Sequence, residues 1–188
     1  MESRTVYFDK PGKENTEAVF EIARKRAEEL GIKTIIVAST TGETGVKAVD
    51  AFKGFKVVIV THVTGSREPN VNPMSDENRR IVLSKGGVTV TAAHAFGSID
   101  RALRKSFNTM NFGETIASVL RIFGQGMKVV CEICLMAADA GAVRTDEEVV
   151  SIGGTGRGAD TAVVLSPVNT TDFFSLKVKE ILCKPRLG

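Results

Sequence analysis

The chain has 188 residues, of which 43% are hydrophobic and 25% charged, and its formal net charge is +3. This composition is ordinary for one globular domain, and no apolar run approaches the roughly 20 residues needed to cross a bilayer. The small, evenly spread charge does not indicate a nucleic-acid partner. We therefore expect a single domain over residues 1–188 that acts without nucleic acid and without a membrane.

The cysteine content and the start of the chain bear on cellular location. Three cysteines, an odd number without paired spacing, argue against the disulfide framework of a secreted domain. The first residues, Met1 to Thr5, lack the apolar centre and the small-residue cleavage site of a signal peptide. Both observations predict a cytoplasmic protein.

The first third of the chain predicts a strand–helix–strand unit. Residues 33–38 and 56–61 are β-branched and nearly continuously apolar, which is typical of strands covered on both faces. A right-handed crossover between them would make a parallel sheet with helices on its faces. The elements predicted here are strands at 6–8, 33–38 and 56–61 and helices at 15–30 and 46–52.

The remainder continues the alternation of helices and strands. Residues 62–73 are too polar for a core element, and residues 92–110 show no clear pattern. Residues 127–140 are apolar nearly all round, with Lys128 and Glu132 four apart as the one obvious ion pair, so they predict a buried helix. The other predicted elements are helices at 75–85 and 111–123 and strands at 88–91, 148–152, 161–165 and 178–182.

A stretch of hydroxyl and glycine residues, 39–45, follows the predicted strand at 33–38. Between a buried strand and a helix, such a stretch is typical of a phosphate site, because the N–H groups at a helix start point at the anion. The hydroxyls of Ser39, Thr41 and Thr44 are candidate donors. Gly42 suits a positive φ and a close approach. The stretch predicts binding of a phosphorylated small molecule.

The most glycine-dense stretch, residues 153–160, follows another predicted buried strand. In an open parallel sheet the ligand lies beyond the carboxyl ends of strands where the strand order reverses, so the two loops meet if their strands are neighbours there. Arg157 can then make a bidentate contact to phosphate. The predicted ligand-binding residues are Ser39, Thr40, Thr41, Gly42, Thr44, Gly154, Arg157, Gly158 and Thr161.

The sequence does not contain a complete nucleotide-binding motif in the structural context that the motif requires. The glycine spacing of residues 154–159 matches the relaxed dinucleotide fingerprint, but a predicted strand follows where that motif needs a helix. Gly45-Val46-Lys47 lacks the Gly-Lys-Ser/Thr of a P-loop. We therefore expect neither Rossmann-type dinucleotide binding nor nucleoside triphosphate hydrolysis.

The remaining candidates for chemistry are thiols, imidazoles and one carboxylate. Cys131 and Cys134 form a C-x-x-C inside an apolar helix without a second cysteine pair, which favours core packing, and no metal site is predicted. His62 and His94 each follow a predicted strand and can titrate near neutral pH. Asp160 ends the glycine loop. The sequence leaves open whether any of these last three is a catalytic acid or base, or only structural.

From residue 15 to residue 167, the order of elements resembles the C-terminal, allosteric domain of pyruvate kinase. Residues 39–45 look like that domain's effector phosphate loop, and residues 154–168 resemble its glycine loop and last strand. The resemblance implies a three-layer α/β/α fold whose five-stranded, mostly parallel sheet has the order 3-2-1-4-5, with strand 5 antiparallel and with extra terminal strands here. Strands 1 and 4 are then neighbours. Kinase activity and sugar-bisphosphate allostery are not implied, because the sequence has no counterpart of that enzyme's catalytic barrel.

The whole chain is similar to a small, largely archaeal family of uncharacterised stand-alone proteins with this fold. The similarity rests on residues 7–12, 14–16, 136–141, 158–162 and 179–181. It implies flavin mononucleotide (FMN) as the ligand and implies no physiological activity.

Three functions remain open at this point. The first is binding of FMN at the two-loop site. The second is an enzyme that acts on a phosphorylated metabolite or by flavin redox chemistry. The third is a regulatory or structural module that works by association. The sequence does not give the oligomeric state, so a homo-oligomer stays open.

Overall fold

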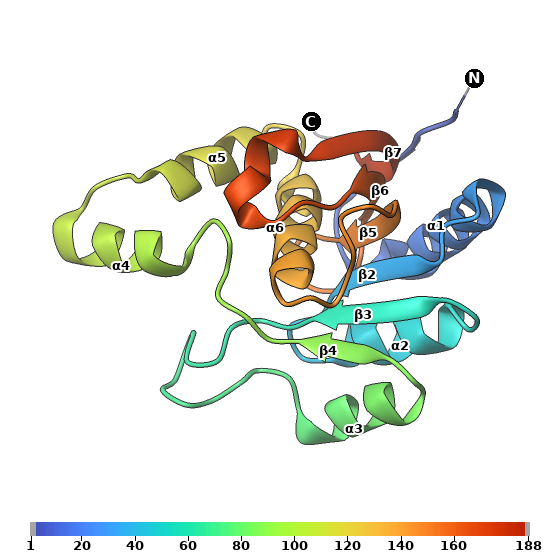
Figure 1. Ribbon diagram of the computed structural model, residues 1–188, viewed down its shortest axis with the longest axis horizontal. Coiled ribbons are helices and arrows are strands. Elements are labelled where there is room, and N and C mark those ends of the chain that lie inside the picture. The colour runs from blue at the N-terminus through green and yellow to red at the C-terminus, as the bar shows by residue number, and fades with distance from the viewer. Residues whose placement is uncertain (1–2, 187–188) are drawn as a thin grey trace.

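The computed structural model describes residues 3–186, which contain a seven-stranded mixed sheet of order β1-β7-β6-β5-β2-β3-β4 (Figure 1). The strands are β1 (Val6–Phe8), β2 (Thr34–Ala38), β3 (Lys56–Val60), β4 (Val88–Val90), β5 (Val149–Gly153), β6 (Thr161–Ser166) and β7 (Lys177–Pro185). The α-helices are α1 (Thr16–Leu30), α2 (Glu43–Ala51), α3 (Asp76–Ser84), α4 (Ser98–Phe107), α5 (Phe112–Arg121) and α6 (Gln125–Asp139). Two 3₁₀ helices are η1 (Lys13–Asn15) and η2 (Thr170–Ser175).

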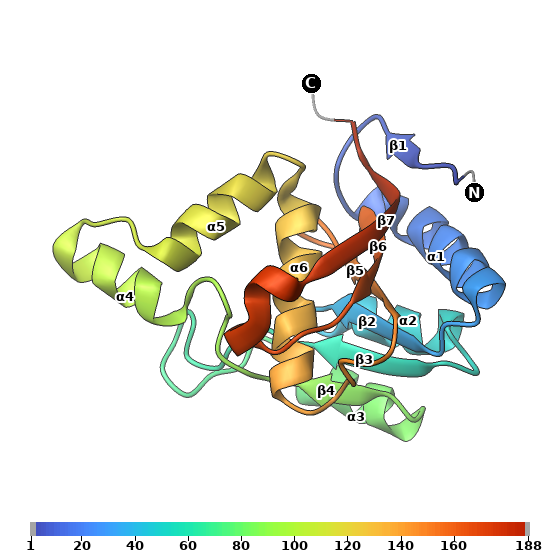
Figure 2. The same cartoon turned by 45° about the horizontal axis from the view of Figure 1, so that its top comes forward.

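Helices cover both faces of the sheet, because its strands are apolar on both sides. On one face, Val19 of α1 and Val49 of α2 belong to one buried cluster with Ile35 and Ile59. On the other face, α6 supplies most of a second buried cluster, which contains Ile36. Successive strand residues point to opposite faces, so the neighbours Ile35 and Ile36 serve the two layers. Figure 2 shows α6 across one face and α1 and α2 behind the other, which is the three-layer arrangement expected.

The sheet has seven strands, which are the five that the resemblance implies and two terminal strands, predicted from the sequence at 6–8 and 178–182. Read from β4, the strands β4-β3-β2-β5-β6 follow the expected order 3-2-1-4-5, and β6 runs antiparallel to β5. The added strands are β7, antiparallel to β6, and β1, parallel to β7. Because β2 pairs with both β3 and β5, the two strands that carry the predicted loops are neighbours, as expected.

The sequence prediction places the start of α2 too late and misses α4. Helix α2 begins at Glu43, inside the predicted loop, so Thr44 and Gly45 belong to its first turn. Residues 98–107, which show no clear sequence pattern, form α4, and this helix buries none of its residues. Together α4 and α5 form an arm that extends away from the sheet and joins the body where α5 packs on α6 (Figure 1). Within residues 3–186, no helix has both the length and the apolar character needed to cross a membrane.

The cysteines lie in the core. Cys131 and Cys134 of α6 and Cys183 of β7 are free thiols with buried side chains. Burial raises the pKa of Cys131 to about 11 and also raises the pKa of Cys134. Because the thiolate is the reactive form, these thiols are inert at neutral pH. The core packing predicted for the C-x-x-C is confirmed.

Candidate functional site

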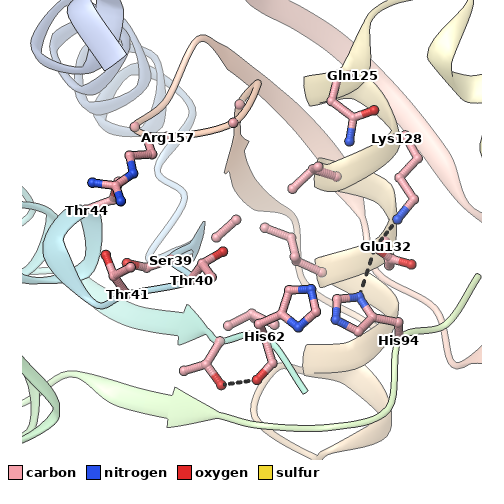
Figure 3. Close-up of a pocket in the computed structure, with 18 of the residues that line it drawn as sticks. Ser39, Thr40, Thr41, Thr44, His62, His94, Gln125, Lys128, Glu132 and Arg157 are labelled. Carbon is pink, nitrogen blue, oxygen red and sulfur yellow. Dashed lines mark hydrogen bonds and ion pairs between the residues drawn. The ribbon is translucent and has the colours of Figure 1, made fainter. Parts of the chain in front are cut away.

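A cavity of about 400 Å³ lies beyond the carboxyl ends of β2, β3 and β5. These three strands are parallel neighbours, so the segments that follow them leave the sheet at the same edge. The loops after β2 and β5 line one side of the cavity and α6 lines the other (Figure 3). The two predicted loops therefore meet in one site.

The first turn of α2 leaves backbone N–H groups free beside the cavity. Gly42 is the N-cap, so the N–H groups of Glu43 and Thr44 have no carbonyl acceptor within the helix. The N–H of Gly45 donates to Oγ of Ser39 at 3.0 Å, which closes the loop on itself. The partial positive charge of a helix start favours an anion at this point.

The positive φ expected at Gly42 is confirmed, with a value of 95°. A Cβ at this position would lie 2.5 Å from Cβ of Asn78 in α3. Asn78 also donates from Nδ2 to the carbonyl oxygen of Thr41 at 3.0 Å. Contacts with α3 thus stabilise the conformation of the loop and leave room only for glycine at position 42.

Asp160 organises the second loop from within. Its side chain is fully buried, and its Oδ2 accepts from the N–H groups of Gly12 and Thr155, each at 3.0 Å. Its Oδ1 accepts from the hydroxyl of Thr161 at 2.8 Å. Asp160 does not line the cavity. Since both oxygens are occupied away from the cavity, the geometry makes Asp160 structural and does not support an acid–base role.

Seven of the nine predicted ligand-binding residues line the cavity, namely Ser39, Thr40, Thr41, Thr44, Gly154, Arg157 and Gly158. Gly42 and Thr161 do not line it. Gly42 shapes the loop through its backbone, and the buried Thr161 directs its hydroxyl to Asp160. Arg157 is exposed and has no hydrogen-bond or ion-pair partner within residues 3–186, so its guanidinium is available to an anion.

Opposite the two loops, charged and imidazole side chains that the predicted site omits line the cavity (Figure 3). Lys128 and Glu132, one turn apart on α6, form the ion pair expected from their spacing. Glu132 also accepts from the N–H of Phe96 at 3.2 Å and lies 3.3 Å from Nδ1 of His94. Its side chain is only 4% exposed. Two sequence signals pointed to parts of this cluster, the i,i+4 spacing of Lys128 and Glu132 and the position of His94 directly after a predicted strand, but neither showed that the two parts meet.

His94 and Lys128 together keep Glu132 ionised. Burial alone would raise the pKa of Glu132, but the hydrogen bond with His94 and the charge and hydrogen bond of Lys128 outweigh burial and lower the pKa to about 2. For Lys128, burial lowers the pKa, and the attraction of Glu132 offsets this only in part. The pair therefore presents a carboxylate and a partly desolvated ammonium group to the cavity.

His62 is the less engaged of the two imidazoles. Its ring lies against that of His94, with centroids 4.3 Å apart and a tilt of 55°. His94 has Nδ1 beside Glu132 and accepts at Nε2 from the N–H of Val63 at 3.4 Å, so both its nitrogens have a partner. Nδ1 of His62 is enclosed without a partner within residues 3–186. Burial, and then electrostatic interaction with His94 and Arg101, lower the pKa of His62, so its ring is an uncharged base at neutral pH.

Positive charge exceeds negative charge around the cavity. The lining contains the cations Arg67, Arg101, Arg121, Lys128 and Arg157 and the carboxylates Glu43 and Glu132. The site can therefore hold an anion at the start of α2 and exchange a proton at the opposite wall. Within residues 3–186, no group of three or more His, Cys, Asp or Glu side chains is arranged to hold a metal ion.

Comparison with known proteins gives one family match and several similar structures. The model of the pyruvate kinase alpha/beta domain matches residues 17–165. A Cryptosporidium parvum pyruvate kinase is 13% identical, with 81% of this chain and 23% of that chain covered and a TM-score of 0.41. The same organism's enzyme in complex with ADP is 14% identical, with 79% and 22% covered and a TM-score of 0.38. An O-ureido-L-serine synthase is 21% identical, with 71% and 49% covered and a TM-score of 0.31. The chain thus spans less than a quarter of these pyruvate kinases.

Proposed function

This chain belongs to the pyruvate kinase alpha/beta domain family, and we propose that its cavity binds a phosphorylated small molecule with the phosphate at the start of α2. The observation that carries the proposal is the pair of free N–H groups at Glu43 and Thr44, beside the hydroxyls of Thr40 and Thr41. Arg157 reaches the same cavity from the second loop. Backbone donors, hydroxyls and a guanidinium are the groups that proteins use to bind phosphate.

We propose FMN as the phosphorylated molecule. The similarity of residues 7–12, 136–141 and 158–162 to the family associated with FMN supports this choice. A volume of about 400 Å³ suits a small-molecule ligand, since such sites span about 300–1,000 Å³. With its phosphate at α2, the flavin ring would extend toward His62, and the backbone at Gly154 and Gly158 would close the other side.

Titration of FMN with the purified protein tests the proposal through flavin fluorescence. We expect the fluorescence to be quenched and the change to saturate at one equivalent. The Arg157→Gln variant should bind about tenfold more weakly, because a charge-assisted hydrogen bond is lost. Arg80→Gln is the matched control, since Arg80 is also exposed but does not line the cavity. Unchanged fluorescence on adding wild-type protein would contradict FMN binding.

A second candidate function is an enzyme that acts on a phosphorylated metabolite. The observation that favours it is the polar character of the wall formed by His62, His94, Lys128 and Glu132. Within residues 3–186, no Phe or Tyr side chain lines the cavity, so stacking on a flavin ring would fall to the imidazoles. Reduction of bound FMN by a nicotinamide cofactor would instead support a flavin-dependent oxidoreductase.

A further inference from the structure

His62 lies within reach of a small molecule whose phosphate sits at the start of α2. Strands β2 and β3 are parallel neighbours paired at Ala38 and Val60, and the N–H of Ser39 donates to the carbonyl of Val60 at 3.0 Å. Neighbouring strands lie about 4.8 Å apart, so the phosphate loop after β2 and His62 after β3 leave the sheet side by side. Both line the same cavity.

A chain of contacts fixes the orientation of His62. Glu132 holds Nδ1 of His94, the N–H of Val63 holds its Nε2, and the His94 ring lies against that of His62. A buried carboxylate on the core side of α6 costs folding free energy that an apolar residue there would not. Groups with perturbed titration that gather in a cavity are typical of functional sites. We assign His94 and Glu132 as positioning residues.

We propose that His62 is a catalytic base that removes a proton from the carbon next to the carbonyl of a phosphorylated hydroxy-aldehyde or hydroxy-ketone. The proposal rests on the phosphate-binding half of the proposed function and takes its second candidate, an enzyme that acts on a phosphorylated metabolite, so this substrate occupies the cavity in place of FMN. An imidazole base and an ammonium group in one desolvated cavity are the two groups that enolisation needs, and no redox partner or metal is required. Lys128 supplies the ammonium group.

The proton and the electron pair balance within the substrate and the protein. The carbon–hydrogen bond breaks, the proton goes to Nε2 of His62, and the electron pair moves onto the carbonyl oxygen. Lys128 donates a hydrogen bond to that oxygen as it becomes negative. Return of the proton from His62 to the same carbon restores the carbonyl and gives back the substrate. Return to the former carbonyl carbon gives the isomer, since the proton of the neighbouring hydroxyl moves to the former carbonyl oxygen and that hydroxyl carbon becomes the new carbonyl. Nothing else is consumed in either direction.

Proton NMR in D₂O tests the step with dihydroxyacetone phosphate and ribulose 5-phosphate as probes. We expect the wild-type protein to exchange the proton next to the carbonyl for deuterium, and unphosphorylated dihydroxyacetone to exchange far more slowly. His62→Gln should slow the exchange at least a hundredfold, the usual contribution of a general base. Lys25→Gln on the exposed side of α1 is the control and should exchange like the wild type.

Calorimetric titration of the same probes separates this proposal from the phosphate site. Binding of a probe without exchange by the wild-type protein would overturn the catalytic role and leave phosphate binding standing. If neither of the two phosphorylated probes binds, the catalytic role of His62 and the phosphate site are both contradicted. A His62→Gln variant that binds a probe as the wild type does and exchanges as fast would also overturn the role of His62.

The pH dependence of the exchange rate tests the proposal with the wild-type protein alone, so it does not require a folded variant. The groups around His62 are His94 after β4, Arg67 in the loop after β3, Arg101 of α4, and Lys128 and Glu132 of α6. Because burial, His94, Arg101 and Arg67 lower the pKa of His62, we expect the rate to rise with pH and to reach half its maximum below the ordinary histidine value of about 6.5. A rate that is independent of pH would overturn the proposal.

Discussion

Gly42 and Gly54 have similar positive φ angles but different surroundings. Their φ angles are 95° and 92°. An added Cβ would meet Asn78 at 2.5 Å from position 42, whereas nothing lies within 4 Å of it at position 54. A comparison of the two alanine variants therefore separates backbone strain from close packing.

We predict that Gly54→Ala lowers the free energy of unfolding by about 1 kcal/mol, the cost of a left-handed residue with a side chain. Gly42→Ala should lower it by about 3 kcal/mol, because overpacking against Asn78 adds to that strain. Urea denaturation measures both values, and FMN titration should show weaker binding only for Gly42→Ala. Equal losses of stability would contradict the account of the loop.

Glu132 links the cavity wall to the pH dependence of stability. Its pKa of about 2 in the folded protein lies below the unfolded value of about 4.3. A carboxyl group with a lowered folded-state pKa contributes stability above the unfolded value, and this contribution is lost as the pH falls from about 5 toward 2.

We predict that Glu132→Gln lowers the free energy of unfolding by about 3 kcal/mol at neutral pH, since it leaves Lys128 buried without its counter-charge. The difference from the wild type should shrink as the pH falls from about 5 to 3. Urea denaturation across this range is the measurement, with the exposed Glu21→Gln as control. A difference that stays constant with pH would show that Glu132 is not the ionised partner.

The sequence predicted the residues on the phosphate side of the cavity better than those on the opposite wall. Thr40, Thr41 and Arg157 could be named from the sequence because glycine and hydroxyl residues after a buried strand are a local pattern. Thr161 is buried and donates from its hydroxyl to Asp160, the residue before it, so the glycine pattern did not show that it lies outside the cavity. The partner of His94 is Glu132, far along the chain, and no local pattern shows such a contact.

At the scale of elements, Asp160 joins the N-terminal segment to the second loop. It accepts hydrogen bonds from Gly12, before η1, and from Thr155 in the loop that carries Arg157. We predict that Asp160→Asn lowers the free energy of unfolding by about 3 kcal/mol, because an amide cannot accept all three bonds with a full charge. Urea denaturation tests this, with the exposed Asp172→Asn as control. Equal stability of the two variants would contradict the role of Asp160.

The strands could be predicted from the sequence for a physical reason that does not apply to the arm formed by α4 and α5. Strands β2, β3 and β5 are buried on both faces, so most of their residues are β-branched and apolar. Helix α4 buries none of its residues, so no apolar spacing fixed by a core marks it within residues 92–110. The start of α2 was missed because its first turn is made of the same small residues as the loop.

At the scale of the whole molecule, the order of the strands determines where the site forms. Neighbouring β2 and β5 bring together two loops that lie more than a hundred residues apart, and α6 completes the cavity from the opposite face. The resemblance gave the order of five strands, and the two added strands, β7 and β1, extend the sheet beyond β6, away from the cavity strands. The cytoplasmic location, the homo-oligomer and the association module stay predictions.

The most direct test of the phosphate site compares FMN with riboflavin, which has the same ring and chain but no phosphate. Fluorescence titration of the wild-type protein gives both dissociation constants. We predict that FMN binds more than tenfold tighter, because its phosphate gains charge-assisted hydrogen bonds at the start of α2 and at Arg157. Equal affinity for the two, or tighter binding of riboflavin, would contradict a phosphate site at this loop.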